Sequence, residues 1–129
     1  MRRKDTVYPT LEEALYLHDR LIERFGGSTG VRDLGLLESA LARPRSGYYA
    51  SLSLQAAALM QSLSQNHAFM DGNKRVAFAI TAVFLHLNGH RLVVGADAAE
   101  RFLIDRVIVA KAEIDEIAAW VEKHFVKSK

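Results

Sequence analysis

The feature that most constrains the fold of this chain is its longest apolar stretch, which runs from Val76 to Leu85 and is interrupted only by Thr81. A transmembrane helix needs about 20 apolar residues, so we interpret this shorter stretch as a helix of the protein core. A helix that is apolar nearly all round is stable in water only when other elements cover most of its sides. The stretch therefore predicts a bundle of helices with this segment at its centre.

Start and stop signals predict where the surrounding helices lie. Thr10 and Glu13 have the spacing of a capping box, in which each side chain accepts a hydrogen bond from the other residue's amide. Gly26-Gly27 ends the helix that begins there. Asp33 and Asp97 are predicted caps of two later helices. The helices predicted in this way cover about 11–25, 34–43, 53–66, 73–87, 97–107 and 113–125.

We therefore predict an all-α fold, a compact single-domain bundle of about six helices. A chain of 129 residues suits one domain, which we assign to 1–129 with its core at about 11–125. Strand signals are scarce, and we expect only a short extended piece from Arg91 to Val94. The segment from Arg43 to Tyr49 lacks helical periodicity and is predicted to be an exposed connection, because Pro44 ends the helix before it.

The composition excludes several classes of protein. Without cysteine the chain has no disulfide framework, no thiolate metal site and no cysteine nucleophile. Its 17 basic and 15 acidic residues are too evenly balanced to indicate direct nucleic-acid binding. No apolar signal segment follows the basic start, Met1 to Lys4, so we expect no secretory leader. We expect a cytoplasmic protein that does not bind membranes.

One stretch lacks the pattern of a packed helix, and it runs from Asn66 to Arg75. It brings an imidazole, a carboxylate, a glycine and two adjacent cations into one tight loop that enters the apolar helix. Polar groups beside a core helix are costly unless they are paired or used. We therefore interpret this loop as the functional site, with the candidate residues His67, Asp71, Gly72, Asn73, Lys74 and Arg75.

The start of the apolar helix is predicted to bind an anion. With Asn73 as the N-cap, the amides of Lys74, Arg75 and Val76 have no partner within the helix. Together with the helix dipole these amides attract negative charge. Gly72 allows the backbone to approach a ligand closely. Cations at a helix N-terminus are unfavourable by themselves, so a bound polyphosphate would explain the two basic side chains.

His67 and Asp71 supply the other groups that a transfer reaction needs. An unperturbed imidazole titrates at about pH 6.5, so His67 is a candidate general base. Asp71 offers hard oxygen ligands for Mg²⁺, which usually accompanies nucleotide phosphates. A base, a metal carboxylate and a phosphate cradle together predict phosphoryl or nucleotidyl transfer, which depends mainly on positioning and charge stabilisation.

The residues from His67 to Arg75 resemble the signature of the Fic/Doc family in its Doc, or death-on-curing, form: His-x-Phe-x-Asp/Asn-Gly/Ala-Asn-Lys-Arg. Gly26-Gly27 followed by the segment from Val31 to Asp33 is also similar to the N-terminal region of that family. The resemblance covers about 11–125 and implies the helical fold of the family. It also implies that His67 is the base, that Asp71 holds Mg²⁺, and that residues 72–75 cradle the phosphates of ATP.

Two positions resemble the Doc form more closely than the wider family. Fic enzymes that transfer AMP typically have glycine where this chain has Lys74, and a second arginine where it has Phe78. In those enzymes the arginine helps to hold the nucleotide for AMP transfer. The resemblance thus implies a toxin that passes the γ-phosphate of ATP to a Ser/Thr hydroxyl of elongation factor Tu and blocks translation. AMP transfer to a protein hydroxyl is the alternative reaction.

The resemblance also implies partners for the chain. Many Fic proteins carry an inhibitory Ser/Thr-x-x-x-Glu-Gly/Asn motif, which this sequence lacks. Its absence fits a toxin restrained by a separate antitoxin chain that wraps it. A catalytically silent protein that only binds an antitoxin is the second hypothesis.

By its order along the chain, the Arg43 to Tyr49 connection is expected to be the family's flap, a short extended segment that aligns the target. The remaining histidines lack metal-ligand spacing and are expected to be structural or exposed: His18, His86, His90 and His124.

Overall fold

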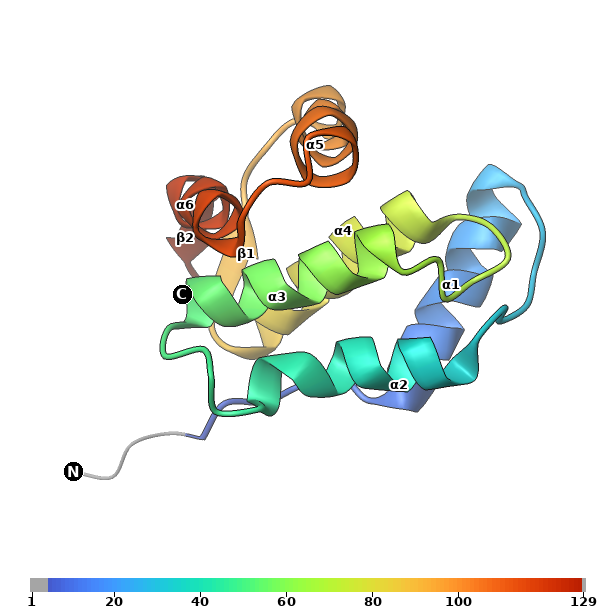
Figure 1. Cartoon of the computed structure of the whole chain (residues 1–129), viewed down its shortest axis with the longest axis horizontal. Coiled ribbons are helices and arrows are strands. Elements are labelled where there is room, and N and C mark those ends of the chain that lie inside the picture. The colour runs from blue at the N-terminus through green and yellow to red at the C-terminus, as the bar shows by residue number, and fades with distance from the viewer. Residues whose placement is uncertain (1–4, 129) are drawn as a thin grey trace.

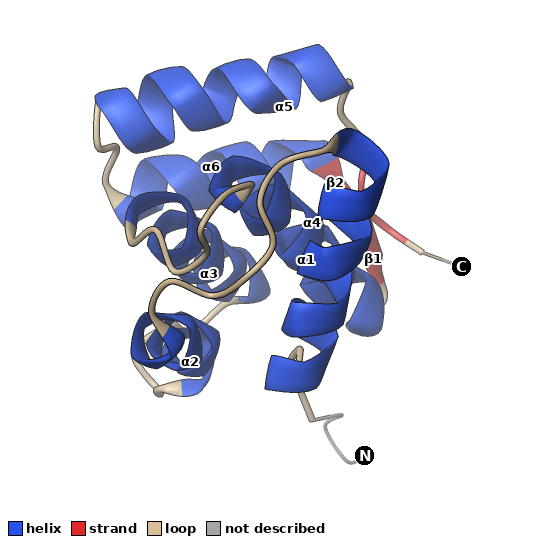
Figure 2. Ribbon diagram, turned by 90° about the vertical axis from the view of Figure 1, so that its right-hand side faces the viewer, coloured by secondary structure: helices blue, strands red, loops and turns tan. Residues whose placement is uncertain are grey.

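The computed structural model describes residues 5–128, which form the predicted bundle of six helices (Figure 1). The elements follow one another in the order α1 (Leu11–Phe25), α2 (Leu34–Ala42), the 3-10 turn η1 (Arg43–Arg45), α3 (Leu52–Gln65), α4 (Asn73–Leu87), β1 (His90–Leu92), α5 (Ala96–Phe102), the π-helix η2 (Leu103–Val109), α6 (Ile114–His124) and β2 (Phe125–Lys127). Helices dominate the fold, and the two short strands lie together at one side (Figure 2). The predicted all-α class is confirmed.

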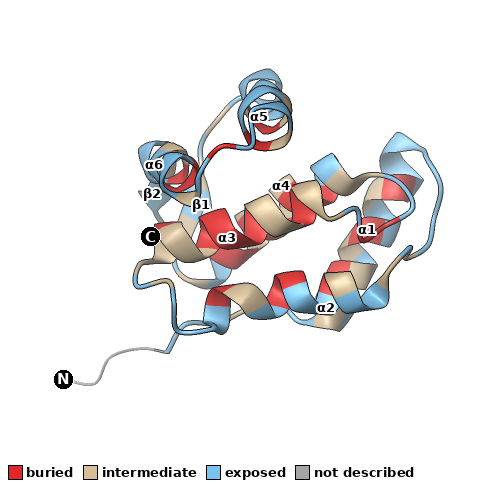
Figure 3. Ribbon diagram, viewed as in Figure 1, coloured by how far each residue is buried: buried red, intermediate tan, exposed pale blue. Residues whose placement is uncertain are grey.

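Helix α4 is the central element, as its apolar sequence predicts. It packs against α1, α3 and β1, and α3 in turn packs against α2 and α6. Buried residues gather along the sides on which these helices face one another (Figure 3). The buried side chains of α4 are Val76, Ala77, Ile80, Thr81, Phe84 and Leu85. This packing fixes the first turn of α4 at one end of the core, where the loop that precedes it reaches the surface.

Two predicted helix starts are confirmed by their hydrogen bonds. The Glu13 amide donates to Thr10 Oγ1 at 3.1 Å, while Glu13 Oε1 accepts from the Thr10 amide at 2.8 Å. These two bonds close the capping box of α1. Asp33 caps α2 by accepting a hydrogen bond from the Leu36 amide at 3.0 Å. The Asp33 cap also fixes the end of the loop between α1 and α2, which lies beside the candidate site.

The predicted cap of the fifth helix is wrong. Gly95, whose backbone is extended (φ −66, ψ 149), precedes α5, and Asp97 lies inside the first turn. The cap position requires non-helical backbone, and Asp97 is already helical. The helix is also not one α-helix to Val107, because α5 ends at Phe102 and continues as η2. Helical turns of the π type are rare and are frequent at functional sites.

The extended piece predicted after α4 forms strand β1. It pairs antiparallel with β2, in the register His90 with Lys127 and Leu92 with Phe125. The His90 ring stacks on the Phe125 ring with 4.7 Å between centroids. The C-terminal segment has no strand pattern of its own and becomes extended through this pairing.

The connection from Arg43 to Tyr49 is not the extended flap that the sequence suggested. Its first part is the 3-10 turn η1, in which Pro44 is buried; proline is well tolerated in the first turn of a helix. The connection precedes α3 and the candidate loop follows it, so the two lie at opposite ends of that helix (Figure 1). A helix of 14 residues is about 21 Å long. The Arg43 guanidinium donates hydrogen bonds to Tyr49, Ala58 and Ser62.

Two segments of the chain lie outside the described range. The basic start, Met1 to Lys4, on which the expectation about a leader depends, is one, and Lys129 at the C-terminus is the other. Within residues 5–128, no helix has the length and apolar character needed to cross a membrane.

Candidate active site

The loop between α3 and α4 contains the predicted site, but the cap of α4 is Gly72 and not Asn73. Gly72 has left-handed backbone (φ 76, ψ 19), and its carbonyl accepts from the Val76 amide at 2.9 Å. Asn73 is therefore the first residue of the helix. The amides that precede the first intrahelical bond are those of Asn73, Lys74 and Arg75. The predicted set of free amides is thus shifted by one residue, since the Val76 amide is used inside the helix.

The side chain of Asn73 closes the loop instead of capping the helix. Its Oδ1 accepts from the Phe69 amide at 3.0 Å, and its Nδ2 donates to the Phe69 carbonyl at 3.0 Å. Both backbone polar groups of Phe69 are therefore matched by one side-chain amide. This pairing holds the loop in a fixed shape immediately before the free end of α4.

Phe69 and His18 anchor the underside of the loop. Phe69 is 1% exposed, and its ring stacks on the His18 ring at a centroid distance of 3.9 Å and an angle of 11°. His18 Nε2 donates to the Asp71 carbonyl at 2.8 Å. Phe69 thus anchors the loop in the core. The contribution of His18 was missed, because it comes from α1 and no local pattern links it to the loop.

A second loop, Gly26 to Asp33, runs alongside the first. Val31 and Phe69 form an isolated antiparallel bridge, and the Met70 amide donates to the Gly30 carbonyl at 3.1 Å. Figure 2 shows the two loops adjacent at the same end of the bundle. This second loop, rather than the connection before α3, is the extended segment that lies beside the candidate site.

Asp71 presents an ionised carboxylate at the surface of the loop. Its Oδ2 accepts from the Ser28 amide at 3.1 Å, and its Oδ1 accepts from the Gly72 amide at 2.8 Å. These two hydrogen bonds hold the pKa of Asp71 below its ordinary value of 3.8, and the positive charge of Arg75 acts in the same direction. The carboxylate is therefore charged throughout the neutral pH range.

The donor set around Asp71 fits a magnesium ion that enters with a nucleotide. The part of the chain that the structure describes has no group of three or more His, Cys, Asp or Glu side chains that could hold a metal ion alone. Mg²⁺ does not need such a group, because it is commonly bound through one or two carboxylates plus substrate phosphates and water. Each Asp71 oxygen accepts one hydrogen bond, which leaves acceptor capacity on both.

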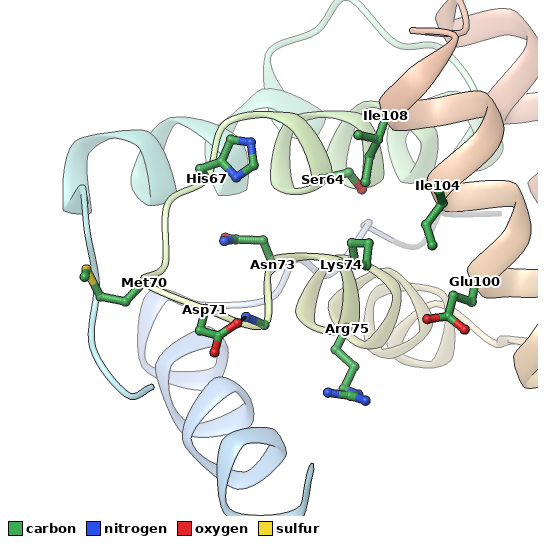
Figure 4. A pocket seen from close by; sticks show the side chains of 11 residues that line it. Ser64, His67, Met70, Asp71, Asn73, Lys74, Arg75, Glu100, Ile104 and Ile108 are labelled. Atoms are coloured by element: carbon green, nitrogen blue, oxygen red, sulfur yellow. Dashed lines mark hydrogen bonds between the residues drawn. The ribbon is translucent and has the colours of Figure 1, made fainter. Parts of the chain in front are cut away.

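The candidate residues line one cavity of about 560 Å³ (Figure 4). This volume is within the range of small-molecule sites, about 300–1,000 Å³. The loop side of the cavity contains every residue singled out from the sequence: His67, Asp71, Gly72, Asn73, Lys74 and Arg75. His67 and Asp71 are exposed, so the loop opens to solvent and is not threaded through the packed interior.

The opposite wall of the cavity comes from α5 and η2, which the sequence analysis did not include in the site. Glu100, Ile104 and Ile108 recur every four residues and line the cavity from this side (Figure 4). Only the packing of α5 and η2 beside the loop identifies them, since their spacing alone is that of an ordinary amphipathic helix.

Two cations lie at the α4 side of the cavity. Lys74 and Arg75 are exposed, and the Arg75 guanidinium lies 4.3 Å from the centroid of the Phe25 ring. A guanidinium over an aromatic face is held by a cation–π interaction. Together with the three free amides, the two side chains give this end of the cavity a positive character that suits an anionic ligand.

Comparisons with known proteins find similar sequences over most of the chain. The model of the Fic/DOC family matches residues 8–85, which include both loops and α4 as far as Leu85. The chain is 46% identical over 102 residues to Toxin Doc of Mycolicibacterium smegmatis, an alignment that covers 74% of this chain and 78% of that protein. It is 35% identical over 82 residues to Protein kinase doc of Escherichia phage P1, which covers 60% of this chain and 65% of that protein.

Proposed function

The chain belongs to the Fic/DOC family, and from this premise we propose that it is a toxin that transfers the γ-phosphate of ATP to a serine or threonine hydroxyl of a protein. The observation that carries the proposal is the meeting of His67, Asp71 and the free end of α4 in one cavity. Phosphoryl transfer requires positioning and charge stabilisation from such groups. Two relatives are named Toxin Doc and Protein kinase doc, which supports a transferase toxin.

The start of α4 is proposed to hold the phosphates. The amides of Asn73, Lys74 and Arg75 precede the first intrahelical bond and are available as donors. Gly72 directs the chain into the helix through its left-handed backbone, and a β-carbon there would lie 3.3 Å from Ile22 Cδ1, so glycine allows this close approach to α1. The side chains of Lys74 and Arg75 add two positive charges. Because the Asn73 side chain is used by Phe69, Asn73 contributes to the cradle through its amide.

Asp71 is proposed to hold Mg²⁺ beside these phosphates. The ion, when bound, would offset negative charge on the phosphate oxygens. Asp71 suits this role because hydrogen bonds from Ser28 and Gly72 both orient its carboxylate and stabilise the charged form. The carboxylate therefore needs no reorganisation to receive a cation.

His67 is proposed to act as the general base. The oxygen of the acceptor hydroxyl attacks the γ-phosphorus and forms a new P–O bond, while the bond from the γ-phosphorus to the bridging oxygen breaks and ADP leaves. The hydroxyl proton passes to the imidazole of His67. His67 lines the same cavity as the phosphate cradle and is exposed to an incoming protein segment.

Positions 74 and 78 favour transfer of phosphate over transfer of AMP. Phe78 is a partly buried residue that packs against the core, so α4 presents no second cation at that position to orient a nucleotide for AMP transfer. Lys74 instead adds a charge at the mouth of the cradle. AMP transfer is the alternative outcome of the experiment below.

The protein target and the restraining partner follow from the family resemblance. Elongation factor Tu is the proposed target, and its modification would block translation. A separate antitoxin chain is the proposed partner. The second candidate function, a silent protein that only binds the antitoxin, is less well supported, because a site without catalytic use has no need of an exposed base beside a phosphate cradle.

ATP labelled at either the α- or the γ-phosphate tests the reaction. The purified chain is incubated with purified elongation factor Tu and, separately, with a bacterial lysate. We expect label from the γ position, and none from the α position, on elongation factor Tu. The His67→Asn variant serves as the inactive control. Label from the α position would replace phosphate transfer by AMP transfer, and γ-label on a protein of another size would replace the target.

A further inference from the structure

The base of the proposed reaction has an unusual backbone conformation. His67 has φ 52, in the left-handed region that residues with a β-carbon rarely adopt. Such conformations persist only where the surrounding structure enforces them, and they cluster at functional sites. Because the backbone angle determines the direction of the Cα–Cβ bond, whatever enforces this angle also aims the imidazole.

Arg32 makes the contacts that enforce it. Its Nε donates to the His67 carbonyl at 2.6 Å, and its Nη2 donates to the Asn66 carbonyl at 3.1 Å. The two acceptors belong to consecutive peptide units, so one planar guanidinium fixes both peptide planes next to the His67 α-carbon. A lysine ammonium has no rigid fork with which to span two such carbonyls.

The end of α3 explains why a cation is stable at this place. The helix ends at Gln65, with Asn66 as its C-cap. The last carbonyls of a helix lack intrahelical partners and carry the negative end of its dipole. A guanidinium there donates hydrogen bonds to the free carbonyls and is attracted to the negative end of the dipole. The residue that follows such a helix end in left-handed conformation is commonly glycine, and here it is His67. The hydrogen bonds from Arg32 stabilise this conformation and so permit a histidine at that position.

The backbone of Arg32 is itself held against the loop. The amides of Arg32 and Asp33 both donate to the Ala68 carbonyl, at 2.8 and 3.0 Å. Asp33 is fixed in addition as the cap of α2. The guanidinium thus extends from a segment that is bonded to the residue immediately after His67, and α2, the second loop and the base form one connected unit.

From this arrangement we propose that Arg32 is a positioning residue, which acts on the reaction by holding His67 in the conformation that places its imidazole in the cavity. Arg32 is outside the set of described residues that line the cavity, so its action is through His67 and not on the nucleotide. The expected effect of Arg32 on the rate of transfer rests on the proposed function, whereas its effect on the orientation of the His67 imidazole does not.

Nuclear magnetic resonance of protein with labelled histidine rings tests the proposal directly. The chain has five histidines, and the His67→Asn variant identifies the His67 signals. We expect Arg32→Ala and Arg32→Lys to shift and broaden the His67 ring signals, while His86, His90 and His124 keep theirs. Arg91→Ala, which removes an exposed arginine from β1, is the matched control and should leave the His67 ring signals unchanged. Thermal melting of each variant confirms that it is folded.

The kinetic test separates positioning from contact with substrate. We expect Arg32→Ala and Arg32→Lys each to lower kcat for transfer by about 10- to 100-fold with KM for ATP within about twofold, because displacement of a catalytic group is costly even when binding is intact. Retention of charge in Arg32→Lys excludes a purely electrostatic effect. Unchanged His67 signals in folded Arg32→Ala, or a raised KM at constant kcat, would overturn the proposal. If wild-type protein transfers nothing from ATP but the His67 signals still move, the proposed function fails while the positioning role stands.

Discussion

The side-chain amide of Asn73 pairs with both backbone polar groups of Phe69, with its oxygen 3.0 Å from the amide nitrogen and its nitrogen 3.0 Å from the carbonyl oxygen. The two residues are four positions apart, and Asp71 lies between them at the tip of the turn that they close. The start of α4 and the Asp71 carboxylate therefore depend on the same pair of hydrogen bonds for their relative positions.

Asn73→Ala should loosen this turn without exposing the core. Loss of the side chain leaves the amide and carbonyl of Phe69 without partners, which costs about 1–3 kcal/mol of unfolding free energy. The measurement is urea denaturation, compared with Asn88→Ala as a control asparagine that bonds elsewhere, to Val7 and Phe84. We also expect weaker ATP binding for Asn73→Ala by calorimetry and not for Asn88→Ala. Equal ATP affinity in both variants would show that the proposed phosphate site keeps its shape without the two hydrogen bonds between Asn73 and Phe69.

The same contact shows where interpretation from the sequence reaches its limit. Asparagine is a preferred N-cap, so its place before an apolar helix predicted a cap. In the structure Gly72 has left-handed backbone and is the N-cap. The side-chain amide of Asn73 instead forms hydrogen bonds with the backbone of Phe69. The choice between these two arrangements depends on where Phe69 is buried, which is a tertiary property.

The parts of the fold that depend on local signals were predictable. The capping box of Thr10 and Glu13 and the apolar run of α4 place helices because caps and periodicity act within a few residues. The motif likewise brings the loop residues of the site together by sequence alone. The support of His18 and the second wall of the cavity could not be predicted, because they come from segments that reach the loop only after the bundle has packed.

Substitution of His18 should destabilise the loop between α3 and α4, which His18 contacts from α1. His18→Ala removes a buried ring stacked on Phe69 and the donor to the Asp71 carbonyl, and we expect a loss of about 2–4 kcal/mol in unfolding free energy. His18→Phe keeps a stacked ring but not the donor, and should lose about 1–2 kcal/mol. Chemical denaturation of both variants checks the order. Equal losses would mean that the stacking contributes nothing beyond the hydrogen bond.

Gly27→Ala should impair nucleotide binding more than folding. A β-carbon at Gly27 would lie 2.7 Å from Asp71 Oδ2, so the carboxylate has to move. Gly26→Ala is the matched control, because Gly26 also has positive φ but its β-carbon would meet nothing within 4 Å. Both variants carry backbone strain of about 1 kcal/mol, yet only Gly27→Ala should weaken binding of ATP with magnesium, by roughly tenfold or more, an estimate for a displaced ligand carboxylate. Titration calorimetry with both variants decides between strain and displacement.

The lowered pKa of Asp71 makes a prediction about acid. A carboxylate whose folded pKa is below its unfolded value of 3.8 stabilises the fold fully above that value, and the contribution is lost as the pH falls through the folded pKa. Asp71→Asn removes this pH-dependent contribution to stability. The wild type should therefore melt at a higher temperature than Asp71→Asn at neutral pH, and the difference should shrink as the pH is lowered below 3.8. A difference that stays constant over this range would show that the two backbone hydrogen bonds do not depend on the charge of residue 71.

The last prediction separates catalysis from binding in the cell. His67→Asn removes the imidazole but suits the backbone, because asparagine tolerates the left-handed conformation that residue 67 adopts at φ 52. The variant should therefore fold normally and bind an antitoxin as well as the wild type, while its transfer rate falls by about 10²–10⁴-fold, the usual contribution of a general base. Expressed without antitoxin, the wild type should arrest bacterial growth and His67→Asn should not. His86→Asn changes a different exposed histidine, which lies on α4 and outside the loop. This variant is the control and should remain toxic. Growth arrest by His67→Asn equal to that of the wild type would mean that the chain acts through binding and not through the transfer of phosphate.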